Sequence, residues 1–119
     1  MSENLKPGDF LVFQLEAGFA LLRLLAVDAA EGNMTWHIAA YSDLFPDVDA
    51  AETASANPSQ LTLSNPHIPL TNRAFESTQV ARIANIPLAN HEIEQLTEWR
   101  NDLNREISDR SVRLMLGLR

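Results

Sequence analysis

The first third of the chain carries three apolar runs separated by short breaks, and each break contains a glycine. The runs extend from Asp9 to Glu16, from Phe19 to Val27 and from Met34 to Tyr41. Glycine and its polar neighbours favour tight turns, and short connections join antiparallel strands, so this pattern predicts a three-stranded β-meander. Alternation in the third run places Trp36, Ile38 and Ala40 on one face of the sheet.

The segments after the meander predict one short helix and two further strands. Pro46 followed by early acidic residues is typical of a helix start, and the helix would turn Leu44, Phe45, Val48 and Ala51 inward. Gln60–Ser64 alternates as a fourth strand would, and the prolines that follow place it at a sheet edge or in an irregular segment. Thr78–Ile86 predicts a fifth strand.

The most regular helical pattern begins at Asn90, a residue that favours helix caps. Its apolar positions follow at spacings of three, three and four residues: Ile93, Leu96, Trp99 and Leu103. This stripe needs a sheet to cover, which predicts an α+β fold with a twisted antiparallel sheet of about five strands and one main helix. A partly closed small barrel is the alternative form of that sheet.

The end of the chain supports two interpretations. Even spacing of Val112, Leu114, Leu116 and Leu118 predicts a closing strand over residues 111–118. A helix that begins at Ser108 competes with it, because short apolar runs are ambiguous by periodicity.

Length and composition predict a single soluble domain over residues 1–119. Apolar residues make up 45% and charged residues 21% of the chain, close to average globular usage. No apolar run approaches about 18 residues and the N-terminus lacks a signal-peptide pattern, so we expect a cytoplasmic protein away from the membrane. The absence of cysteine excludes disulfides, thiolate nucleophiles and cysteine-bound metals.

The net charge of −7 is concentrated in one half of the sequence. Residues 1–60 contain two basic and nine acidic side chains, whereas residues 61–119 contain seven of each. An acidic surface repels nucleic acid and attracts basic proteins. We therefore expect a basic protein partner, and the acidic segment after the meander supplies the candidate partner-binding residues Asp43, Asp47, Asp49 and Glu52.

Sequence motifs for catalysis, cofactors or metals are absent. The four glycines form neither a phosphate-binding loop nor a dinucleotide fingerprint, and no Gly-x-Ser-x-Gly elbow occurs. The histidines His37, His67 and His91 lack zinc-site spacing, so we expect ordinary polar roles for them. The acids of Asp47–Glu52 lack the glycine and later glutamate of a calcium loop. No catalytic, cofactor-binding or metal residue is assigned.

Three short pieces of the chain resemble a known family. They are Pro7-Gly8-Asp9-Phe10, Gly18-Phe19-Ala20-Leu21-Leu22-Arg23-Leu24-Leu25 and Ala84-Asn85-Ile86-Pro87-Leu88. Together they are similar to the immunity protein 26 type family of bacterial polymorphic-toxin systems. The resemblance implies a small soluble domain that neutralises a toxin made by the same cell, and it implies no particular functional residue.

These observations predict a protein-binding module, of immunity type, that neutralises a basic toxin through its acidic N-terminal half. A small enzyme or enzyme subunit that uses carboxylates with His37 or His67 in a cleft is the alternative from another class. A homo-oligomeric structural protein, in which the apolar C-terminal strand pairs with its twin, is the third. We favour binding over catalysis because no chemical motif is present.

Overall fold

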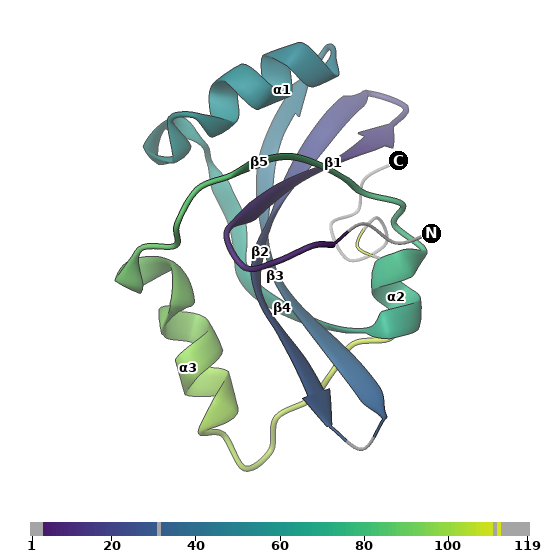
Figure 1. Cartoon of the computed structure of the whole chain (residues 1–119), viewed down its shortest axis with the longest axis vertical. Coiled ribbons are helices and arrows are strands. Elements are labelled where there is room, and N and C mark those ends of the chain that lie inside the picture. The colour runs from purple at the N-terminus through teal and green to yellow at the C-terminus, as the bar shows by residue number, and fades with distance from the viewer. Residues whose placement is uncertain (1–3, 31, 111, 113–119) are drawn as a thin grey trace.

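A computed structural model describes residues 4–30, 32–110 and 112 of the chain (Figure 1). Five strands form one antiparallel sheet in the order β4-β3-β2-β1-β5. Their bounds are β1 Asp9–Leu15, β2 Gly18–Ala30, β3 Asn33–Phe45, β4 Leu63–Thr71 and β5 Ala81–Asn85. The predicted α+β class and the β-meander are therefore confirmed, and β2 and β3 are longer than the apolar runs that indicated them.

Gly18 allows the first hairpin to lie against the far end of β3. The predicted connection is confirmed, because β1 and β2 are joined by Glu16 and Ala17, and Gly18 has a φ of +149°. A Cβ atom on Gly18 would lie 2.8 Å from the carbonyl oxygen of Phe45. A side chain at this position would push the hairpin away from β3.

The sheet is open, so the alternative of a partly closed barrel is wrong. β4 and β5 lie at opposite edges, and each pairs with one other strand of the sheet; β4 also forms an isolated parallel bridge from Leu70 to Ser108. The edge position of β4 agrees with the prediction from its prolines, but the strand runs through Pro66 and Pro69 and does not stop before them. Proline cannot donate to a ladder, and an edge strand tolerates this on its free side.

Both faces of the sheet are covered, which explains why whole strands are buried. One face carries the largest apolar cluster, to which α2 (Asn72–Glu76) contributes Ala74 and Phe75. The other face is covered by α1 (Val48–Ser55), which buries Ala51, and by α3 (Glu94–Arg100), which buries Leu96. Figure 1 shows α2 on one side of the sheet and α1 and α3 on the other.

The expected main helix is divided and shorter than predicted. It consists of a 3-10 turn, η2 (Asn90–Ile93), followed by α3, which ends at Arg100. Leu103, predicted to face the sheet, is 97% exposed. The helix ends at Arg100, and the Trp99 indole N–H donates to the carbonyl of Glu106 in the segment that follows. The apolar spacing therefore extends to Leu103 in the sequence, although the helix does not.

The remaining elements complete the molecule. A second 3-10 turn, η1, spans Pro58–Gln60. The prediction for residues 111–118 lies outside the described residues except for Val112, which is fully buried in the largest apolar cluster. No helix among the described residues is long and apolar enough to cross a membrane.

Candidate functional site

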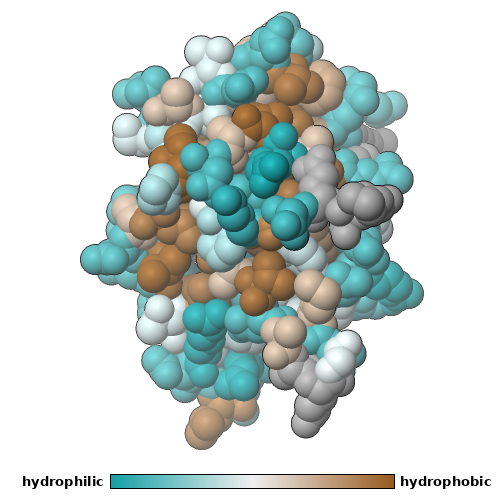
Figure 2. All heavy atoms as spheres, in the orientation of Figure 1, coloured by the Kyte–Doolittle hydropathy of each residue, from teal (hydrophilic) through white to brown (hydrophobic). Residues whose placement is uncertain are grey.

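The face of the sheet beneath α1 and α3 is hollowed by a pocket of about 440 Å³. Its floor is made by alternate residues of β2 and β3, and Arg23 lies beside Ala39 in the strand register. Figure 2 shows hydrophobic residues gathered on the left of the view, between the positions of α1 and α3 in Figure 1. The apolar and proline residues of the lining are Leu25, Ala39, Pro58, Leu61, Leu63, Pro66, Ile86, Pro87 and Ala89.

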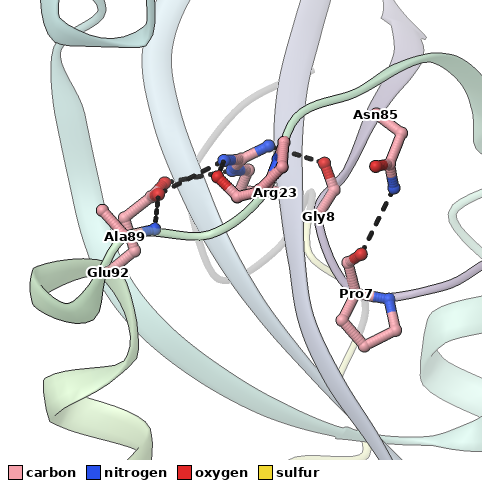
Figure 3. A network of polar contacts seen from close by, with 7 residues as sticks. Pro7, Gly8, Arg23, Asn85, Ala89 and Glu92 are labelled. Atoms are coloured by element: carbon pink, nitrogen blue, oxygen red, sulfur yellow. Dashed lines mark hydrogen bonds and ion pairs between the residues drawn. The ribbon is translucent and has the colours of Figure 1, made fainter.

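Arg23 is the polar centre of this pocket. It interrupts the apolar run Phe19–Val27 and is 1% exposed, and its guanidinium carbon lies 4.2 Å from the ring centre of Phe10. Arg23 Nε and Nη2 donate to the two carboxylate oxygens of Glu92, at 3.0 and 3.2 Å. Nη1 donates to the Gly8 carbonyl at 2.6 Å, and Figure 3 shows the guanidinium between this carbonyl and Glu92. The pairing satisfies a charge that burial would otherwise make costly.

Glu92 ties this arginine to the η2 turn. Burial works against its charged form, but hydrogen bonds from Arg23 and from the Ala89 N–H outweigh burial, so the pKa of Glu92 lies below its usual value. The pair is therefore ionised at pH 7 and electrically neutral as a unit.

Tyr41 also lines the pocket and is only 5% exposed. Its ring stacks on Phe10, with ring centres 6.1 Å apart. Among the described residues, none donates to or accepts from the Tyr41 hydroxyl. Burial raises the pKa of Tyr41 to about 12, so the hydroxyl keeps its proton and can donate it to an acceptor.

A second polar cluster joins residues that are far apart in the sequence. His37 Nε2 lies 3.0 Å from Asp28 Oδ2, and His37 Nδ1 lies 2.9 Å from His67 Nε2. Arg100 of α3 donates to the other oxygen of Asp28 at 2.6 Å. Trp99 packs edge-on against both imidazole rings. A histidine–carboxylate cluster, which the sequence left open, therefore forms from Asp28, His37 and His67, whereas His91 lies apart on η2.

The directions of the pKa shifts in this cluster indicate which of its ring nitrogens carry protons at pH 7. Burial opposes the charge on Asp28, but Arg100 and His37 outweigh it and hold the pKa of Asp28 below its usual value. Burial lowers the pKa of His37, and burial with repulsion from His37 and Arg100 lowers the pKa of His67 to about 4. Both rings are then neutral at pH 7, so His37 donates to Asp28, His67 donates to His37, and Nδ1 of His67 is unprotonated.

His67 lines a second, smaller and more polar hollow of about 300 Å³ beside α3. Its lining includes His67, Trp99 and the acidic residues Glu98 and Asp102. The described residues contain no group of three or more side chains placed to hold a metal ion. The cluster can accept a proton at His67, but a pKa of about 4 makes this ring a weak base at neutral pH.

The four predicted acidic residues lie together where β3 passes into α1. Asp43 is near the end of β3 and accepts the Thr62 N–H at 2.6 Å, and Asp47 caps α1 by accepting the Ala50 N–H at 2.7 Å. Asp49 and Glu52 are exposed on α1 itself. None of the four forms an ion pair with a described cation, and their role in partner binding stays a prediction.

Other acids of the N-terminal half are neutralised by arginines of the second half. Asp9 is fully buried and lies 3.9 Å from Arg82, and it also accepts the Asn85 side-chain N–H at 2.7 Å. Asp28 is paired with Arg100. The excess negative charge therefore does not cover the whole N-terminal half, and the junction of β3 and α1 keeps acids that are free of ion pairs within the described chain.

Sequence reasoning did not locate the pocket, and it named His37 and His67 as candidates without identifying Asp28 as their partner. An arginine within the apolar run Phe19–Val27 was a usable signal, because a charge in the middle of a buried strand requires a partner. Residues 28, 37, 67 and 100 share no local spacing. The pairing of β3 with β2 and β4 brings the first three together, and the packing of α3 on the sheet adds Arg100. No protein-family model, curated protein or solved structure matches the chain.

Proposed function

We propose that the protein is a binding module that engages a basic protein through the acidic junction, defined as Asp43, Asp47, Asp49 and Glu52. The observation that supports this most directly is the set of acids at the β3–α1 junction without a described ion-pair partner, while Asp9 and Asp28 are neutralised within the fold. Asp43 and Asp47 also accept backbone N–H groups, whereas the side chains of Asp49 and Glu52 are exposed. Complementary charge would speed encounter with a basic protein and disfavour others.

Exposed apolar side chains beside the acids support a protein partner over a small cation. Leu44 is 40% exposed and Val48 is 37% exposed, although the sequence pattern predicted both to face inward. Protein interfaces combine an apolar centre with a polar rim. The acidic junction with Leu44 and Val48 has this composition.

The resemblance to the immunity protein 26 type family gives the partner a proposed identity. A toxin domain made by the same cell, with a basic surface, would fit the acidic junction. In this proposal the module neutralises the toxin by covering it and performs no chemistry on it.

The experiment reverses only the acids that the fold does not use. Asp43 and Asp47 accept backbone N–H groups, so their replacement would damage the junction as well as its charge. We therefore change Asp49→Lys and Glu52→Lys together. The matched control is Glu94→Lys with Glu98→Lys on α3, which changes the net charge equally, on exposed positions of another helix.

Tagged wild-type protein and both double variants would be used to isolate partners from native extract, followed by mass identification and binding measurements at rising salt. We expect wild type and the α3 variant to retain the same basic protein, and the α1 variant to lose it. The wild-type affinity should fall as salt rises. Equal retention by both variants, or equal loss from both, would remove the acidic junction from the proposal.

A specific observation also supports catalysis as a second candidate function. Asp28, His37 and His67 form a hydrogen-bonded chain that ends at an unprotonated nitrogen beside the polar hollow. General bases work best when their pKa lies near the operating pH. An NMR titration of His67 distinguishes the two functions: a midpoint near 7 would favour a catalytic base, whereas a midpoint near 4 would favour a structural role.

A further inference from the structure

We propose that the pocket over β2 and β3 binds an uncharged, largely apolar small molecule that hydrogen-bonds to the Tyr41 hydroxyl. This site is separate from the acidic junction, and it does not depend on the protein partner proposed above. The argument rests on the size of the pocket, on its internal charge balance and on one buried hydroxyl.

The size and composition of the pocket fit a small organic molecule. Its volume of about 440 Å³ lies within the range of roughly 300–1,000 Å³ that is typical of ligand sites. The lining is mainly apolar, with few polar groups, which is also typical of such sites. Pro58, Pro66 and Pro87 contribute to three separate parts of the wall. Because proline has restricted backbone torsions, the pocket is largely preformed.

The two buried or half-buried charges at the pocket, Arg23 and Glu92, are already paired, and His91, the imidazole of the lining, is exposed; this disfavours an ionic ligand. Arg23 donates to both oxygens of Glu92 and to the carbonyls of Gly8 and Pro87. Glu92 in turn accepts from Arg23 and from the Ala89 N–H. A carboxylate ligand would have to displace Glu92, and a cationic ligand would have to displace Arg23. Either exchange leaves a buried charge with a poorer partner.

Tyr41 supplies the polar contact that the chain itself leaves unused. It is 5% exposed, and its hydroxyl has no hydrogen-bond partner among residues 4–30, 32–110 and 112. Buried polar groups are nearly always hydrogen-bonded in folded proteins. A ligand carbonyl or ether oxygen that accepts from this hydroxyl would satisfy it and would orient the apolar part of the molecule along the wall.

The test uses three probes with the same aromatic body and different charge: 2-naphthamide, 2-naphthoate and 2-naphthylmethylammonium. Each would be titrated into isotope-labelled full-length protein and followed by NMR. We expect 2-naphthamide to give saturable shifts at pocket residues, with an affinity at least about tenfold higher than that of either charged probe, because neither ion finds an unpaired counter-charge there.

Three variants locate the site. Tyr41→Phe should weaken 2-naphthamide binding about five- to tenfold, the usual effect of one neutral hydrogen bond. Ala39→Met places a longer side chain on the pocket floor and should abolish saturable binding. Ala81→Met is the matched control, because Ala81 is exposed on β5 and does not line the pocket, so binding should be unchanged.

Several outcomes would overturn the proposal. They are the absence of saturable shifts with any probe, charged probes that bind as tightly as the amide, and unchanged binding in Tyr41→Phe or Ala39→Met. The melting temperature of ligand-free Tyr41→Phe gives a further check. It should equal or exceed that of wild type, because the lost hydroxyl has no partner in the chain. A fall of several degrees would show that the hydroxyl is bonded within the protein.

Discussion

His67 illustrates how burial decides the role of a single residue in this protein. Its imidazole is half-buried, lies beside His37 and is close to the positive charge of Arg100, and all three effects disfavour protonation. The pKa of about 4 therefore keeps the ring neutral at pH 7, with its Nε2 proton donated to His37 and its Nδ1 unprotonated. The cluster links β2, β3, β4 and α3, so its first consequence is for stability.

The protonation of His67 predicts how stability depends on pH. In the unfolded chain its pKa is about 6.5, above the folded value of about 4, so below pH 6.5 the unfolded state binds more protons. The stabilising contribution is fully present above pH 6.5 and is lost as the pH falls towards 4. We expect a loss of about 2 kcal/mol across this window, after allowance for the partial exposure of His67.

Urea unfolding at pH 7.5, 6.5, 5.5 and 4.5 measures this slope. His67→Gln should flatten it, whereas His91→Gln should not, because His91 is exposed and lies outside the cluster. An unchanged slope in His67→Gln would show that other groups cause the pH dependence.

At the scale of elements, local pattern predicted strands better than it predicted helix ends. The meander was predictable because glycine-containing breaks and apolar runs are local features, and register follows from short turns. The end of α3 was not predictable from the apolar period, because Trp99 is held by a hydrogen bond to Glu106, seven residues ahead. The covering of both faces of the sheet was also not predictable from alternation, because strands that are buried on both faces have few polar positions.

The Arg23–Glu92 pair predicts a strong link between the sheet and the segment that leads into α3. Glu92→Gln keeps the shape of the side chain but leaves the buried guanidinium without a counter-charge. Removing one member of a fully buried pair costs about 3–5 kcal/mol, and Glu92 retains 16% exposure, so we expect a loss of about 2–3 kcal/mol in the free energy of unfolding.

Urea unfolding at pH 7 checks this value. Glu94→Gln on the exposed side of α3 is the control and should change the free energy by less than about 0.5 kcal/mol. Replacement of both members by methionine should recover much of the loss, since it removes the uncompensated charge. A small effect of Glu92→Gln would mean that water screens the pair.

At the scale of the whole molecule, the two halves of the sequence neutralise each other only in part. Arg82 and Arg100 reach back to Asp9 and Asp28, and this long-range pairing removes two acids from the surface charge that the sequence suggested. Composition predicted the sign of the surface, but only the fold shows that the acidic junction keeps its acids outside ion pairs of the described chain. The histidine cluster also depends on the fold, because Asp28, His37 and His67 meet through sheet pairing and Arg100 reaches them from α3.

Val112 is buried in the apolar cluster that also contains residues of β1. Val112 is 0% exposed and belongs to the same apolar cluster as Leu11 of β1 and Leu70 of β4. Val112→Ala removes two buried carbon atoms and leaves a small cavity, so we expect the free energy of unfolding to fall by about 2 kcal/mol. Leu103→Ala is the control, because Leu103 is almost fully exposed and its loss should cost less than about 0.5 kcal/mol.

The same variants bear on the homo-oligomeric alternative, since Val112 cannot serve both the core and a subunit interface. We expect urea unfolding to show the loss in Val112→Ala at every protein concentration, and light scattering to give the same molar mass for wild type and variant. If Val112→Ala instead lowered the molar mass, or if its stability loss disappeared at high concentration, this part of the chain would contribute to contact between copies. A loss as small as that of Leu103→Ala would mean that the core is complete without Val112.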